Sequence, residues 1–89
     1  MHETNGKLEA SDLALQALAW ALQDEARAER LLALTGLTPD SLRTSVQEHS
    51  TQAAILSFLE AHEPDLIACA AVIGVPPAAL VQARQELEA

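Results

Sequence analysis

Two glycine–proline pairs set the strongest constraint on how this chain can fold. Gly36 is followed by Pro39, and Gly74 is followed by Pro76 and Pro77. Glycine readily adopts the left-handed conformation that ends many helices, and proline is favoured at the first position of a helix. Each pair therefore predicts one helix that ends at the glycine and a second helix that begins at the proline.

The residues between these breaks favour helix over strand. Most of the apolar residues are Ala and Leu, and the only aromatic residues are Trp20 and Phe58. Ala and Leu are strong helix formers, whereas strands favour Val, Ile and aromatic residues. The apolar run 66–73 is short enough to form a strand, but its three alanines and the proline and glycine that flank it favour a helix.

We predict an all-α chain: a flexible N-terminal tail over residues 1–10, then a single helical domain over residues 11–89. A chain of 89 residues buries one modest core and not two. About six short helices are expected, with starts near Ser11 or Asp12, Asp24, Thr38–Pro39, Ser50 or Thr51, Pro64 and Pro76–Pro77. The pattern leaves open whether the first two helices are separate or continuous near Asp24. The predicted core includes Leu18, Trp20, Leu34, Phe58, Leu66, Val72 and Leu80.

The two halves of the chain resemble each other. When residues 20–48 are laid on residues 58–86, Trp20 meets Phe58, Gly36 meets Gly74 and Pro39 meets Pro77. These positions fix where helices end and begin, so the match is consistent with two tandem three-helix units that contain helix-turn-helix-like corners. The alternative is that any two helix corners with this punctuation look alike.

Charge and length exclude several functions. The net charge is −8, and such a surface repels phosphate backbones and anionic lipid. The longest apolar run, residues 66–73, is far shorter than the ~20 residues that a membrane helix needs. The first residues also lack the basic and apolar regions of a secretory signal. We therefore expect a cytoplasmic protein without nucleic-acid or membrane partners.

The corner at Gly74 has the spacing of a DNA-binding helix-turn-helix, with Ala70 before it and Leu80 after it. The second helix of this corner carries Arg84, but it also carries Glu86 and Glu88. Because phosphate neutralisation supplies much of the affinity for DNA, a DNA-binding regulator remains only the alternative function.

No residue pattern predicts catalysis, a cofactor or a metal site. His62 lies among acidic residues, but zinc sites use several His or Cys ligands at set spacings. Cys69 lies in an apolar run, whereas a nucleophilic cysteine needs a neighbouring base and a positive, partly exposed setting. We predict a solvated helix-end cluster at His62 and a buried structural thiol at Cys69, so a small enzyme is a further, weaker alternative.

Several stretches resemble a known family of small bacterial proteins. They are residues 20–25 (WALQDE), residues 31–39 (LLALTGLTP) and residues 74–77 (GVPP). The chain is similar, over about residues 12–88, to the domain-of-unknown-function family numbered 3572, which is found mainly in alphaproteobacteria. In that family a proline often follows the acidic pair, where this chain has Ala26. The resemblance implies the helical fold and no activity or ligand.

The function therefore stays unknown from the sequence, and the best hypothesis is a small non-catalytic module for protein–protein interaction. The first helix is apolar nearly all round and needs cover from several directions. Few other helices can provide this cover, so we expect part of its surface, around Leu15, Ala19 and Leu22, to bind a protein partner or a second copy of the chain. The alternative is that alanine-rich helices pack closely and leave only scattered methyl groups exposed.

Overall fold

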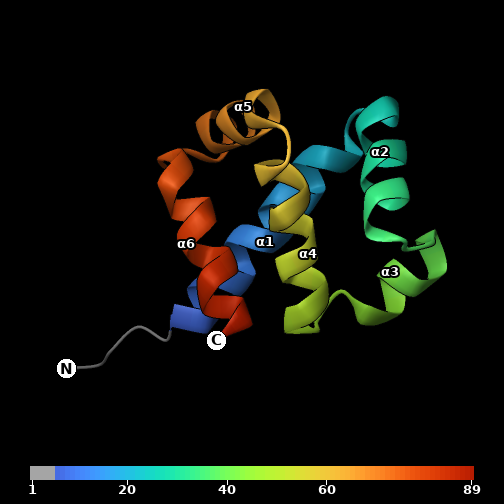
Figure 1. Cartoon of the computed structure of the whole chain (residues 1–89), viewed down its shortest axis with the longest axis horizontal. Coiled ribbons are helices and arrows are strands. Elements are labelled where there is room, and N and C mark those ends of the chain that lie inside the picture. Colours follow the sequence, from blue (N-terminus) through green and yellow to red (C-terminus); the bar gives the residue numbers. More distant parts are fainter. Residues whose placement is uncertain (1–5) are drawn as a thin grey trace.

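The computed structural model describes residues 6–89 as six α-helices, with no strand in that range (Figure 1). The helices are α1 (Gly6–Leu22), α2 (Glu25–Thr35), α3 (Pro39–Ser45), α4 (His49–Glu60), α5 (Glu63–Ile73) and α6 (Pro77–Glu88). The predicted all-α class is confirmed. Residues 1–5 of the predicted tail lie outside the described residues, and residues 6–10 already form the first turns of α1.

The boundaries of α2, α3, α5 and α6 follow the predicted punctuation, but α4 begins at His49 with Glu48 at its N-cap, so the predicted caps Ser50 and Thr51 lie inside the helix. Gly36 and Gly74 take left-handed conformations, with φ of 76° and 90°, and they end α2 and α5. Pro39 and Pro77 are the first residues of α3 and α6. Near Asp24 the chain breaks into two separate helices: this residue is extended, and its side chain accepts a 2.9 Å hydrogen bond from the backbone N–H of Arg27.

The core lies between α1, α4 and α6. Helix α6 packs along both α1 and α4, and α1 presents small buried residues to its neighbours. The buried residues of α1 include Ala10, Ala14, Ala17 and Ala21, and those of α4 include Ile55, Leu56, Phe58 and Leu59. Alanine has little side chain, so helices that meet along it approach closely. In Figure 1, α1 and α4 cross the middle of the molecule, α6 lies on one side of them, and α2 and α3 lie on the other.

The predicted core is right at four positions and wrong at two. Leu18, Trp20, Phe58 and Leu80 are buried, and Leu66 is half-buried. Leu34 and Val72, however, are 65% and 69% exposed. Both lie in the last turn of an outer helix that buries one face only, through Leu31 in α2 and through Cys69 and Ala70 in α5. For the same reason α5 is not the interior helix that its apolar sequence suggests, and Ile67 is half-exposed.

The repeat is visible in the helix boundaries. The shift that carries Trp20 onto Phe58 lays α2 on α5 residue for residue, and it also aligns the ends of α1 and α4 and the starts of α3 and α6. Burial follows the same shift: Leu31 and Cys69 are both buried, and Leu34 and Val72 are both exposed. Helix α2 packs on α1 and α4, and α5 packs on the same two helices. We name the halves unit 1 (α1–α3) and unit 2 (α4–α6).

The repeat breaks at its third helix. Helix α6 has 12 residues and packs along α1 and α4, whereas α3 has 7 residues and makes no extensive contact with either of them. After α3 the chain must turn at once into α4. The buried Gln52 holds this turn by donating from Nε2 to the Val46 carbonyl at 2.9 Å, and the Thr51 and Ser45 hydroxyls meet at 2.9 Å. Unit 1 is therefore open where unit 2 is closed.

Candidate partner-binding surface

The surface predicted on the first helix remains partly uncovered. Leu22 is 47% exposed, Ala19 is exposed and Leu15 is half-buried. The three residues follow one another along α1, but they do not line one hollow. Leu22 lines a hollow towards α2 and α3, and Ala19 lines another hollow towards α5. The residues predicted to bind a partner thus lie beside two separate hollows.

The first site is an apolar hollow of about 350 Å³ between the three helices of unit 1. We call it the α1–α3 groove. It is lined by Leu18, Leu22, Leu32, Pro39, Leu42, Arg43 and Val46. Leu18 and Leu42 are buried, whereas Leu22 is open to solvent and Leu32 and Val46 are partly so. Arg43 is the charged residue of this lining, and its Nη1 donates to Asp40 Oδ1 at 2.7 Å.

The groove corresponds to a closed helix contact in unit 2. The shift that relates the units places Leu22 on Glu60 and Val46 on Arg84. Glu60 and Arg84 form an ion pair that ties α4 to α6, and the hydrogen bond to Glu60 raises the pKa of Arg84. In unit 1 the two matching positions are leucine and valine, and both line the groove instead of closing it.

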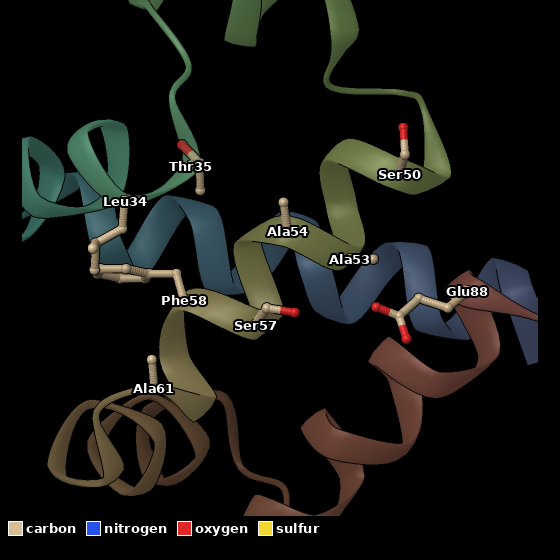
Figure 2. Close-up of a pocket in the computed structure, with 9 residues that line it drawn as sticks. All are labelled: Leu34, Thr35, Ser50, Ala53, Ala54, Ser57, Phe58, Ala61 and Glu88. Atoms are coloured by element: carbon tan, nitrogen blue, oxygen red, sulfur yellow. The ribbon is translucent and has the colours of Figure 1, made fainter.

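Two further hollows are themselves related by the repeat. One, of about 590 Å³, lies between α2 and α4, and Figure 2 shows Leu34 and Phe58 at one end of it and Ser50 and Glu88 at the other. The second, of about 260 Å³, lies between α1 and α5. Its lining is Gln16, Ala19, Trp20, Gln23, Val72 and Ile73, and the shift carries all six onto residues that line the larger hollow. At the positions where the larger hollow has Ala54 and Ala61, the smaller hollow has Gln16 and Gln23, and these longer side chains take up more of its space.

Arginine side chains hold α2 against its neighbours. The Arg27 guanidinium lies 3.8 Å from the centre of the Trp20 ring, and its Nη2 donates to the Trp20 carbonyl at 2.9 Å. Arg30 forms an ion pair with Asp65 of α5 and lies 5.7 Å from the centre of the Phe58 ring. With Arg43 on Asp40 and Arg84 on Glu60, all four arginines have acceptors or rings within the chain.

The residues that the sequence offers for chemistry lie in structural settings. Cys69 is fully buried, and burial raises the pKa of its thiol from 9.0 to about 11. His62 Nδ1 lies 3.0 Å from Asp65 Oδ2, the same carboxylate oxygen that Arg30 contacts. Within residues 6–89 no three His, Cys, Asp or Glu side chains come together as a metal site. These contacts agree with the predicted buried thiol and helix-end cluster.

Over the described part of the chain, no single helix is both long enough and apolar enough to cross a membrane. The pair α5 and α6 meets the requirements of length and composition only when the two helices are taken together, and they are bent by 99° at the break between them.

Comparison with known proteins identifies a family. The family described as proteins of unknown function, DUF3572, matches residues 7–89. No curated protein and no solved structure matches the chain. The resemblance seen in residues 20–25, 31–39 and 74–77 is thereby confirmed at the level of the family. Because the match spans nearly the whole chain, this protein belongs to the DUF3572 family.

Proposed function

We propose that this protein is a small helical module that binds another protein and has no catalytic activity of its own. The observation that supports the proposal is the exposure of Leu22 in the α1–α3 groove. A single exposed leucine is ordinary on a protein surface, but one that forms the rim of an apolar hollow with a buried apolar floor is typical of a binding site.

The shape of the groove favours a helix as the bound element. Three helices form its walls, and its lining is aliphatic apart from Arg43. Grooves of this kind receive the apolar face of an amphipathic helix, with anchors spaced at i, i+3, i+4 and i+7. Leu22 and Leu32 would flank the inserted side chains, and Leu18 and Leu42 would lie beneath them.

A partner of different sequence has more support than a second copy. Each copy of the chain carries a net charge of −8, so two copies repel each other at low ionic strength. The same charge supports the expectation that nucleic acids and anionic membranes are not partners. We further propose that the module acts in the cytoplasm of alphaproteobacteria; the resemblance to a family found mainly in these bacteria supports the source.

The test is a comparison of two matched variants of the tagged full chain in its native cells. Leu22→Glu places a charge in the groove, and Ile67→Glu places the same charge on α5, at a residue that is 50% exposed. We expect wild type and Ile67→Glu to co-purify with the same partner and Leu22→Glu to lose it, with all three chains equally helical by circular dichroism. If Leu22→Glu keeps every partner, the groove is not the binding site and the proposal is wrong.

A further inference from the structure

We infer that the outward side of α5 is a docking surface for a second copy of this chain, and that two copies associate weakly through an antiparallel pair of α5 helices. This surface is separate from the α1–α3 groove. It goes beyond the proposed function, and neither proposal depends on the other.

Helix α5 turns an uncharged apolar side to solvent. Its buried residues, Cys69 and Ala70, face the core, and Ile67 and Val72 on the other side are 50% and 69% exposed. No charged side chain occurs anywhere from residue 66 to residue 83. In Figure 1, α5 lies at the upper edge of the molecule, so no other helix covers this side. We call it the α5 outer face: Pro64, Ile67, Ala68, Ala71 and Val72, all of them exposed.

The repeat shows that the fold does not require this face to be apolar. The shift that relates the two units places Ile67 on Glu29 and Ala68 on Arg30 of α2. Helix α2 occupies the equivalent place, packs on the same two helices and carries these charges on its outward side. Because the same position in the fold accepts charged residues in unit 1, packing within the chain does not explain the apolar residues of unit 2.

The occupant of the face must itself be uncharged where it makes contact. A charged side chain pressed against Ile67 or Val72 would lose water and find no partner for its charge. The α5 outer face of a second copy meets this requirement. Its composition is also self-complementary, since two alanines lie at its centre and one larger aliphatic residue lies on each side of them. A contact between two identical surfaces needs such a symmetric pattern.

An antiparallel pair fits this pattern. Ala68 of each copy would lie against Ala71 of the other, and these small residues allow the helices to approach closely. Ile67 would meet Ile67 of the second copy on one side of the pair, and Val72 would meet Val72 of the second copy on the other. The acidic first turn of α5, with Glu63 and Asp65, would then lie at opposite ends of the pair. A parallel pair would bring these acidic turns together.

Size and net charge both make the association weak. One face of a single helix is smaller than the ~800 Å² per partner of a standard interface. Each copy also carries a net charge of −8, so two copies repel each other when salt is low. Salt shortens the range of this repulsion, from ~30 Å at 0.01 M to ~10 Å at 0.1 M, but it does not weaken the apolar contact. Association should therefore strengthen as salt is added.

Sedimentation equilibrium of the full chain from ~10 µM to ~1 mM, at low and at moderate salt, measures this association. We expect wild type to dimerise with concentration, and more strongly at the higher salt. Ile67→Glu should dimerise at least ~tenfold more weakly. Leu34→Glu is the matched control, because it adds the same charge to the outward side of α2 at a residue that is 65% exposed. It should dimerise as wild type does, and all three chains should be equally helical by circular dichroism.

A mixing experiment tests the antiparallel arrangement. Ile67→Glu and Ile67→Lys should each remain monomeric, because like charges meet across the pair. An equal mixture of the two should form a dimer, because the two charges are then opposite. A mixture of Ile67→Glu with Val72→Lys should not be restored, since these residues lie on different sides of an antiparallel pair. Restoration in that mixture alone would overturn the antiparallel arrangement.

Three other results would overturn the docking surface itself. They are a wild type that stays monomeric at every concentration and salt, a dimer that Ile67→Glu leaves intact, and equal weakening by Leu34→Glu. The failure of the proposed function is separate, because Leu22→Glu should lose the native partner and still dimerise, whereas Ile67→Glu should keep the partner and not dimerise. If wild type is monomeric but Leu22→Glu loses its partner, the α5 docking surface is wrong and the proposed function stands.

Discussion

Phe58→Ala tests the packing of the core most directly. Phe58 lies on α4, is 3% exposed and contributes one wall of the hollow between α2 and α4. The guanidinium of Arg30 lies 5.7 Å from the centre of the Phe58 ring. Truncation to alanine therefore removes a buried ring and one attachment of α2 at the same time.

The magnitude follows from these two losses. Replacement of a buried Phe by Ala costs about 3–5 kcal/mol of unfolding free energy. The ring borders an open hollow, so water can enter part of the space that it leaves, which places the cost near ~3 kcal/mol. The exposed cation–ring contact of Arg30 adds roughly 0.5 kcal/mol. We expect a total of about 3–4 kcal/mol, a large share of the ~5–15 kcal/mol that stabilises a typical domain.

Urea titration followed by far-ultraviolet circular dichroism measures this loss, and the melting temperature should fall by more than ~12 °C. Leu34→Ala is the matched control, because Leu34 lines the same hollow but is 65% exposed. Its cost should stay within about 0.5 kcal/mol. A cost below ~1 kcal/mol for Phe58→Ala, or equal costs for the two variants, would refute the assignment of Phe58 to the core.

Three further measurements test other features. Burial raises the pKa of Cys69 from 9.0 to about 11, so the stability that its neutral thiol contributes is complete below pH 9.0 and is lost as the pH rises towards 11. Urea titrations at pH 8 and pH 11 should therefore show that wild type loses at most ~2.5 kcal/mol more unfolding free energy than Cys69→Ala does. Equal losses in the two proteins would contradict the raised pKa. Gly74→Ala should cost about 1–2 kcal/mol through its φ of 90° alone, because an added Cβ meets nothing within 4 Å; a neutral result in thermal melts would exclude the left-handed cap. Zinc or a chelator should leave the melting temperature unchanged, and a shift that His62→Ala abolishes would reveal a metal site.

The local punctuation of this fold can be predicted from the sequence, because single residues determine it. The left-handed glycines, the prolines that begin helices and the cap at Asp24 act within a turn of themselves, and they set both ends of α2 and α5 and the starts of α3 and α6. The start of α1 could not be predicted in this way. Residues 6–10 resemble a tail in composition, yet the helix extends back to Gly6 and buries Ala10.

The positions of Leu34 and Val72 could not be predicted, because burial depends on what lies opposite a helix and not on its own composition. Both residues end helices that lie on the outside of the core. The groove was predictable only in part. An excess of apolar surface on α1 indicates that something remains uncovered, and Leu22 is indeed exposed. That the gap lies against α3 depends on the short turn from Ser45 to α4, which no periodicity reveals.

The position of α2 and α3 also has a consequence for local stability. Only Leu31 in α2 and Leu42 in α3 are buried, and Arg27 and Arg30 add contacts from α2 to Trp20 and Asp65. Segments with so few buried residues open without unfolding the rest of the chain. The amide hydrogens of α2 and α3 should therefore exchange with solvent earlier than those of α4 and α6. Since α3 forms one wall of the groove, a bound helix would slow exchange in α3 most, and recognition would be coupled to the ordering of this part of the chain.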